Sequence, residues 1–161
     1  MSDHGDLWPR PLGPLHIDRA YSLVREIAGP LSLEDWRRYA RHFAAAHPGQ
    51  YPAPAGMVVI EDEAERIRAL FAYCLLPSLT YGGMLALDCL VVPEMVYRRR
   101  AAESLLKGAE ACARHFDCHM LSARLERSNA WLGGLLREFG FREEGLGLRR
   151  PLLRLANATS A

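Results

Sequence analysis

Hydrophobic residues near the start of the chain recur at helical spacing. Between residues 17 and 28 they fall every three or four positions, and Gly29-Pro30 ends the pattern. Ser32 and Asp35 then have the spacing of a capping box, with Asp in the less usual role, and they predict the start of a second helix. The apolar face of that helix would carry Trp36, Tyr39, Ala40 and Phe43.

The middle of the chain alternates between apolar runs and turn residues. Residues 47–55 contain three prolines and predict a loop. Residues 57–60 and 67–76 predict two strands, and the acidic stretch 61–65 between them predicts a solvated hairpin tip. Residues 85–92 are almost continuously apolar, which is typical of a strand buried on both faces.

The last third returns to helical and strand patterns in alternation. We expect a helix over residues 100–116, a strand over 119–125 and a helix over 129–139, with Gly140 as its left-handed C-cap. Residues 146–155 predict a final strand. The whole order indicates an α/β (α+β) domain in which a mixed sheet carries helices on both faces.

Composition narrows the classes of protein that the chain can represent. Its 161 residues predict one domain, over residues 15–156, between tails at residues 1–14 and 157–161. The net charge of +1 gives no general attraction to nucleic acid or membrane, and no apolar run approaches a membrane span. The N-terminus lacks a signal-peptide pattern, so we expect a cytoplasmic protein with its four cysteines free. Lys107 is the only lysine, which suggests a bacterial genome of high GC content.

A metal site is considered at four neighbouring residues and set aside. Cys112 and His115 are expected one helical turn apart, but Cys118 and His119 would point to opposite faces of a strand. We therefore expect no metal, and the sequence has no Walker or dinucleotide-binding fingerprint either. The four residues are Cys112, His115, Cys118 and His119.

Three stretches in the second half resemble those of one protein superfamily. Residues 88–94 are similar to its central strand, residues 105–111 to its CoA-binding helix, and residues 128–130 with 139–141 to its closing helix. The superfamily is GNAT, the acyl-CoA-dependent N-acyltransferases. The resemblance covers about a third of the chain by residue pattern and most of it by element order, and it implies a mainly antiparallel sheet.

The resemblance places the CoA pyrophosphate at the turn before the helix. In the family that turn contains Gln or Arg and then glycines, whereas here it contains arginines and alanines. The amide donors belong to the main chain, so losing the glycines does not remove them, and the arginines can attract phosphates. The alternative is a solvated turn with an acidic partner. The residues concerned are Tyr97, Arg98, Arg99, Arg100, Ala101 and Ala102.

The resemblance also assigns roles around the central strand. Asp88 is the candidate base for the acceptor amine, or else a strand-entry residue bonded to the backbone. The main chain of Leu90, Val91 and Val92 would pair with the acyl and pantetheine amides, and Asn129 would either touch CoA or cap its helix. Leu136 stands where the family often has a catalytic Tyr, for which Ser128 or a water could substitute, unless no such acid is needed.

The sequence therefore predicts an N-acetyltransferase with acetyl-CoA as cosubstrate. The acceptor would be a small-molecule or peptide amine, and a homodimer is expected only by analogy with the family. The first alternative is a non-catalytic module that senses CoA or binds protein, and the second is a transferase that uses a protein-bound acyl carrier.

Overall fold

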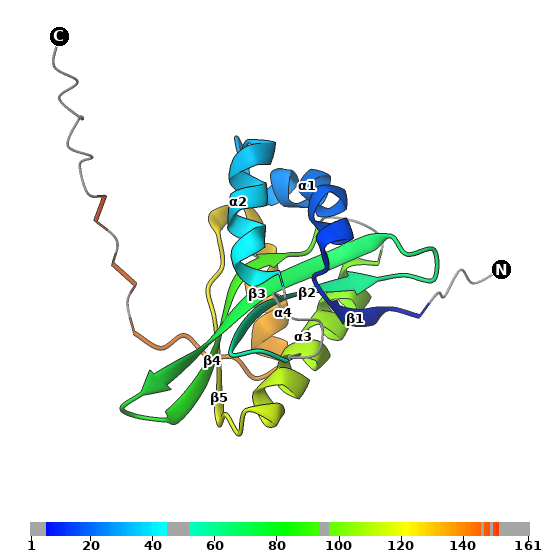
Figure 1. Cartoon of the computed structure of the whole chain (residues 1–161). Coiled ribbons are helices and arrows are strands. Elements are labelled where there is room, and N and C mark those ends of the chain that lie inside the picture. The colour runs from blue at the N-terminus through cyan, green and yellow to red at the C-terminus, as the bar shows by residue number, and fades with distance from the viewer. Residues whose placement is uncertain (1–5, 45–51, 94–96, 146, 149, 152–161) are drawn as a thin grey trace, which may run out of the picture.

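A computed structural model describes residues 6–44, 52–93, 97–145, 147–148 and 150–151. They form a five-stranded sheet with two helices packed on each face (Figure 1). The elements are β1 (Trp8–Pro11), α1 (Pro14–Ala28), α2 (Leu33–Phe43), β2 (Ala55–Glu61), β3 (Ile67–Ser78), β4 (Gly82–Val91), α3 (Arg98–His115), β5 (Met120–Ala123), the 3-10 helix η1 (Arg127–Asn129) and α4 (Trp131–Glu138).

The strands lie side by side in their order along the chain. The first four pair antiparallel with their neighbours, whereas β5 pairs parallel to β4 after the crossover through α3. The hairpin of β3 and β4 protrudes from one side of the molecule (Figure 1). The prediction of a mixed, mainly antiparallel sheet with helices on both faces is confirmed.

The core consists of two clusters, one on each face of the sheet. α3 and α4 pack with Phe71, Leu85 and Leu87 on one face, and α1 and α2 pack with Leu70 and Val91 on the other. Both clusters draw on β4, which explains its almost continuous apolar sequence. At 25 cal/mol per Å², each fully buried aliphatic side chain contributes about 1.5–3 kcal/mol to folding.

The first strand corrects the prediction that residues 1–14 form a tail. Trp8–Pro11 pairs antiparallel with β2 at the edge of the sheet. Its residues do not alternate between apolar and polar, and they include Pro9 and Pro11, so the usual strand pattern is missing. Proline is nevertheless compatible with the edge of a sheet. Pro9 also packs on α3, where a Cβ on Gly108 would come within 3.2 Å of it.

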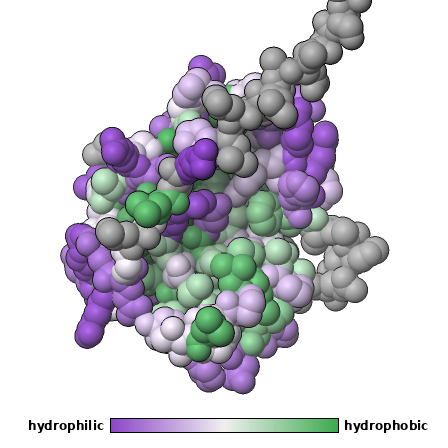
Figure 2. Space-filling view, turned by 90° about the vertical axis from the view of Figure 1, so that its left-hand side faces the viewer, coloured by the Kyte–Doolittle hydropathy of each residue, from purple (hydrophilic) through white to green (hydrophobic). Residues whose placement is uncertain are grey.

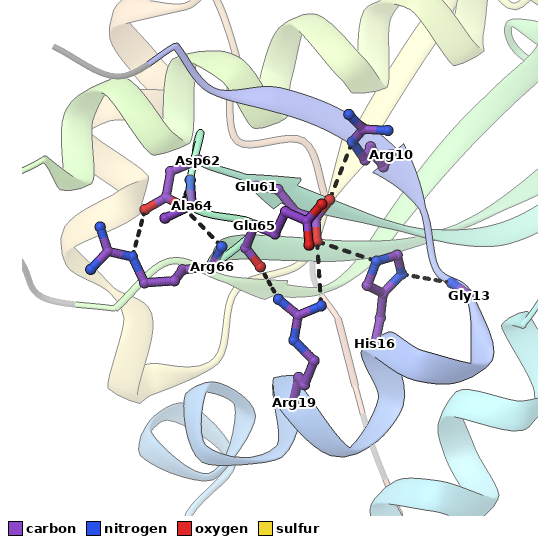
Figure 3. A network of polar contacts seen from close by, with 9 residues as sticks. All are labelled: Arg10, Gly13, His16, Arg19, Glu61, Asp62, Ala64, Glu65 and Arg66. Atoms are coloured by element: carbon purple, nitrogen blue, oxygen red, sulfur yellow. Dashed lines mark hydrogen bonds and ion pairs between the residues drawn. The ribbon is translucent and has the colours of Figure 1, made fainter.

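A buried carboxylate ties this N-terminal region to the sheet and corrects part of the predicted acidic turn. Glu61 is only 5% exposed and belongs to β2. Its carboxylate lies 3.2 Å from Arg10, 3.2 Å from His16 and 3.9 Å from Arg19 (Figure 3). The Gly13 amide donates to Nδ1 of His16, so the neutral ring carries its proton on Nε2 and donates it to Glu61. These contacts hold β1, α1 and β2 together.

The turn that follows is organised by Asp62. Its carboxylate accepts from the main chain of Arg66 and from the side chains of Arg66 and Arg68 (Figure 3 shows Arg66). Burial on its own raises the pKa of Asp62, but these hydrogen bonds outweigh it and lower the pKa to about 2. Glu61 and Asp62 therefore have structural partners and are not simply solvated, whereas Glu63 and Glu65 are exposed.

Helix ends follow their sequence signals closely in the N-terminal half. α1 ends at Ala28, and Gly29 follows with a φ of 71°. The Ser32 hydroxyl accepts from the Asp35 amide at 3.1 Å, so this cap is confirmed. In the C-terminal half, α3 begins at Arg98, two residues before the predicted start, and the last helix is divided into η1 and α4.

Several predictions concern residues that are only partly described. Residues 147–148 and 150–151 of the predicted last strand are not in a strand, and the rest of it lies outside the described residues. The tail 157–161 and most of the loop 47–55 also lie outside the described residues. None of the four cysteines forms a disulfide, as predicted, and Cys112 is buried. Within the described ranges, no helix is both long and apolar enough to cross a membrane.

Candidate functional site

The sheet opens between β4 and β5. β5 pairs with β4 from Met84 to Leu87, and a last hydrogen bond runs from the Arg124 amide to the Leu87 carbonyl at 3.3 Å. Beyond it β4 continues to Val91, whereas the chain after β5 turns away into η1. The two parallel strands therefore diverge beyond Leu87, between the last two strands of the described sheet.

A bulge in β4 lies directly at this opening. Ala72 pairs with Asp88 and Leu70 pairs with Val91, so β4 contains one residue more than β3 across this stretch. Cys89 takes up the irregularity with a φ of 48°, which is strained for a residue with a side chain. The bulge shifts the alternation of side chains, because Leu85, Leu87 and Leu90 all pack toward α3.

The Leu90 carbonyl already has a partner. Nδ2 of Asn129 donates to it at 2.7 Å, across the gap between the strands. Asn129 is completely buried, and its Oδ1 meets no donor among the described residues. The side chain therefore points at β4 and does not cap a helix, so the capping alternative is wrong. Contact of CoA with Asn129, or with the main chain of Leu90, Val91 and Val92, stays a prediction.

Asp88 also has a partner that the sequence did not reveal. Its Oδ1 accepts from Arg124 at 2.6 Å, and both side chains are about half exposed. This ion pair raises the pKa of the Arg124 guanidinium, so that residue stays cationic. Asp88 and Arg124 become neighbours because β4 and β5 are parallel and in register, with Leu87 opposite Ala123. That register depends on the crossover through α3 and leaves no local sequence signal.

Two more residues from the α2 side complete this cluster, which we call the acceptor-side cluster (Tyr39, Asp88, Cys89 and Arg124). The Tyr39 hydroxyl is buried beside the Cys89 thiol. Burial raises its pKa, and the neighbouring Cys89 and Asp88 raise it further. Burial likewise raises the pKa of the Cys89 thiol, to about 12. Both groups therefore stay protonated at neutral pH, and Arg124 carries the positive charge of the cluster.

The predicted pyrophosphate turn is the first turn of α3. Tyr97 precedes the helix, and the Ala101 amide donates to its carbonyl at 3.0 Å. Ala101 and Ala102 are buried, so their side chains belong to the core. The amides of residues 98–100 precede the first intrahelical bond, and they are the ones that a phosphate at this helix terminus would use.

The three arginines of this turn differ in their surroundings. The Arg98 guanidinium lies over the Trp131 ring, 4.7 Å from its centroid. Arg99 bonds to Glu138 at 2.8 Å and to Glu103 at 3.2 Å, which is the acidic partner that the alternative interpretation expected. Arg100 is exposed and forms no ion pair with any described residue. Arg100 therefore remains the side chain best placed to meet an anion.

The position expected for a catalytic Tyr holds a core residue. Leu136 is buried between α4 and the sheet, so the side chain at this position is apolar and cannot donate a proton. The candidate substitute Ser128 donates its hydroxyl to the Ile27 carbonyl at 2.7 Å. Gly140 adopts a φ of 89° and ends α4, as predicted. Among the described residues there is also no group of His, Cys, Asp or Glu that could hold a metal ion.

Sequence comparisons find no relative of the chain. No protein-family model matches it, and no curated protein matches it.

Solved structures do match its fold. A glucosamine-6-phosphate N-acetyltransferase from Arabidopsis thaliana has a TM-score of 0.67 at 12% identity, over 91% of this chain and 98% of that chain. An aminoglycoside N-acetyltransferase in complex with CoA has a TM-score of 0.72 at 11% identity, over 94% and 98%. A transcriptional regulator from Bacillus halodurans C-125 has a TM-score of 0.73 at 13% identity, over 91% and 100%. Likenesses at such identities show a common fold.

Proposed function

Because this chain has the fold of the GNAT superfamily, we propose that it transfers an acetyl or other short acyl group from acyl-CoA to a primary amine. The observation that carries the proposal is the opening between β4 and β5 beside the first turn of α3. A thioester arm can lie in such an opening while its diphosphate lies at the helix terminus. A structural neighbour that was solved with CoA supports this choice of donor.

The donor would be held by main chain and by arginine. The amides of residues 98–100 would face the diphosphate, and Arg100 would add a charge-assisted hydrogen bond. The Arg98 and Trp131 pair offers a flat cationic surface beside the diphosphate. The main chain from Leu90 to Val92 would pair with the amides of the pantetheine arm, as the resemblance implies.

The acceptor would approach from the acceptor-side cluster. The amine attacks the thioester carbon, a tetrahedral intermediate forms, and its collapse releases the amide and the CoA thiolate. Asp88, directly or through a water, would take the proton that the attacking nitrogen loses, while Arg124 keeps the carboxylate in place. Because Leu136 provides no acid, the thiolate would take its proton from solvent. A positioned general acid is worth about 10²- to 10⁴-fold, so we expect a modest kcat.

Two assays test the proposal directly. Acetyl-CoA at 100 times its dissociation constant should stabilise the protein by about 2.7 kcal/mol in a thermal shift. Thiol release with a panel of primary amines then measures turnover. Failure to bind any acyl-CoA at millimolar concentration would refute the donor site.

A matched pair of variants locates the donor. Arg100→Gln should weaken acetyl-CoA binding about tenfold, since a hydrogen bond to a charged group is worth about 1.5 kcal/mol or more. Arg41→Gln removes an equally exposed arginine from α2, on the other face of the sheet, and should leave binding unchanged. Equal effects of the two substitutions would place the diphosphate elsewhere.

The second candidate is a non-catalytic module with the same fold. It is favoured by the burial of Leu136 and by the ion pairs that already engage Arg99 and Asp88. A structural neighbour described as a transcriptional regulator shows that this fold is not restricted to proteins described as enzymes. Binding of acyl-CoA without thiol release for any amine would favour this candidate.

A further inference from the structure

The ion pair of Asp88 and Arg124 lies on the open part of one sheet face. Leu85 and Leu87 of β4 pack toward α3, and so does Ala123 of β5. Because side chains alternate along a strand, Asp88 and Arg124 point to the opposite face, which α1 and α2 share. The core under those two helices includes residues of β2, β3 and the end of β4, but no described residue of β5. The pair therefore remains accessible, with its side chains 44% and 57% exposed.

Each partner of this ion pair has hydrogen-bonding capacity left. A terminal nitrogen of Arg124 donates to Oδ1 of Asp88 at 2.6 Å, and this is the one hydrogen bond that joins the two side chains in the described structure. Arg37 and Asp18, by contrast, are joined by two. A guanidinium has five N–H donors in one plane, and a carboxylate has two acceptor oxygens. A ligand with one cationic and one anionic group can therefore bind both partners at once.

The direct contact between the partners sets the spacing that such a ligand needs. Because their charged groups touch, an ammonium beside Asp88 and an anion on Arg124 must be close neighbours in the ligand. An α-amino acid meets this condition, since its nitrogen and its carboxylate are bonded to the same carbon. A peptide N-terminus has a neutral amide at that position, and a simple amine has no anionic group.

The charges around the pair disfavour an acidic side chain on the ligand. The hydrogen bond to Asp88 raises the pKa of Arg124, and Glu126 adds a weaker electrostatic effect in the same direction. The guanidinium thus stays cationic and can bind the carboxylate that every amino acid has. A second carboxylate on the ligand would be repelled by Asp88 and Glu126.

Apolar residues adjoin the pair on the same face. Cys74 of β3 pairs with Ala86 of β4, and Leu76 pairs with Met84. All four alternate with residues that pack toward α3, and all are partly or well exposed. Their strands form the hairpin that extends away from α1 and α2 (Figure 1). Figure 2 looks from that side and shows hydrophobic surface gathered at the centre within a hydrophilic rim. An apolar side chain on the ligand can therefore pack beside the ion pair.

We propose that the acceptor is an α-amino acid with an apolar side chain, whose carboxylate binds Arg124 while its nitrogen lies at Asp88. This inference rests on the proposed acyl transfer and names its acceptor. The α-ammonium loses one proton to solvent, and the free amine attacks the thioester carbonyl carbon. Its second proton passes to Asp88, the C–S bond breaks, and the CoA thiolate takes a proton from solvent. Arg124 then determines specificity in addition to holding Asp88.

Acceptors that differ only at the carboxylate test the substrate class. L-phenylalanine, L-phenylalaninamide and phenethylamine are compared in the thiol-release assay with acetyl-CoA, with kcat/KM expressed per unprotonated amine. The value for phenylalanine should exceed that for either neutral analogue about 10- to 100-fold, which is the effect of a hydrogen bond between charged groups. Equal values for these acceptors, or a lower value for phenylalanine than for L-glutamate, would overturn the proposal.

A matched pair of variants assigns the preference to Arg124. Arg124→Gln should bring the ratio of kcat/KM for phenylalanine and phenethylamine close to one, and the ratio cancels any loss of rate that arises through Asp88. Arg114→Gln is the control, because it removes an exposed arginine that pairs with Glu110 at 3.0 Å on α3, on the other face of the sheet. It should leave the ratio unchanged. An unchanged ratio in Arg124→Gln would show that Arg124 does not bind the carboxylate.

Product binding separates this inference from the proposed function. N-acetyl-L-phenylalanine has the carboxylate but no reactive amine, so calorimetric titration in the presence of CoA measures its affinity whether or not any amine is acetylated. It should bind about 10- to 100-fold more tightly than N-acetylphenethylamine, and Arg124→Gln should remove the difference. Such selectivity without turnover of any acceptor would refute the transferase and support the amino-acid site. Equal binding of the two products would overturn the site, even in an active enzyme.

Discussion

Asn129 offers the sharpest test of how the open sheet is held together. Asn129→Ala removes the donor that lies 2.7 Å from the Leu90 carbonyl and leaves that buried oxygen unpaired. An unpaired buried polar group costs about 1–3 kcal/mol, and no other described residue replaces the donor. Taking about 2 kcal/mol, a chain of this size should melt about 4–8 °C lower. Thermal unfolding by circular dichroism measures the change.

Asn129→Asp tests the same contact through pH. An ionised carboxylate cannot donate to the Leu90 carbonyl, whereas a protonated one can, so the folded state should raise the pKa of the new group above its unfolded value of about 3.9. Its contribution is then fully present below the unfolded pKa and is lost as pH rises through the folded pKa. The gap in melting temperature between this variant and wild type should therefore widen from pH 4 to pH 8.

Two results would refute this reasoning. Asn157→Ala is the matched control, because it changes the same residue type in the predicted C-terminal tail and should leave the melting temperature unchanged. If Asn129→Ala has the same melting temperature as this control, the Leu90 carbonyl does not depend on Asn129. A gap for Asn129→Asp that is constant with pH would show that the side chain is not held at the carbonyl.

Three other substitutions probe the turn, the sheet and the acceptor-side cluster. Asp62→Asn should lower the free energy of unfolding by about 1 kcal/mol at pH 7, after allowance for solvent screening. Since the pKa of Asp62 is lowered to about 2, that difference should disappear as pH falls toward 2, which acid titration of stability can follow. Gly56→Ala should cost about 1–3 kcal/mol in urea unfolding, because its Cβ would lie 2.8 Å from the Tyr73 hydroxyl; an unchanged midpoint would contradict this. Asp88→Asn should lower kcat in the thiol-release assay about 10²- to 10⁴-fold without changing acetyl-CoA binding, and a wild-type kcat would exclude Asp88 as the base.

The elements with regular periodicity were predictable, and those defined by pairing were not. The Ser32 cap, the turn at Gly29 and the buried strand β4 follow from local sequence, and each is confirmed. β1 was missed because Pro9 and Pro11 disrupt its pattern, and its strand character comes from pairing with β2. Glu61 was assigned to a solvated turn because its partners come from the N-terminal region, far away in sequence.

In the candidate site too, one part was predictable from the sequence and another was not. The resemblance located the central strand β4 and the helix terminus at α3, because both belong to a contiguous stretch of sequence. The partners of Asp88 and Arg99 lie 36 and 39 residues away, and only the register of the folded chain brings them together. Tyr39 was interpreted as a core residue, and its position beside Cys89 depends on how α2 packs on the sheet.

The prolines of β1 have a consequence for self-association. Open-ended growth through sheet edges requires two receptive edges on every molecule, one at each side. On the β1 side, Pro9 and Pro11 have no amide hydrogen to offer an incoming chain. Growth that uses both edges of the described sheet is therefore blocked at β1, so molecules cannot add edge to edge without limit.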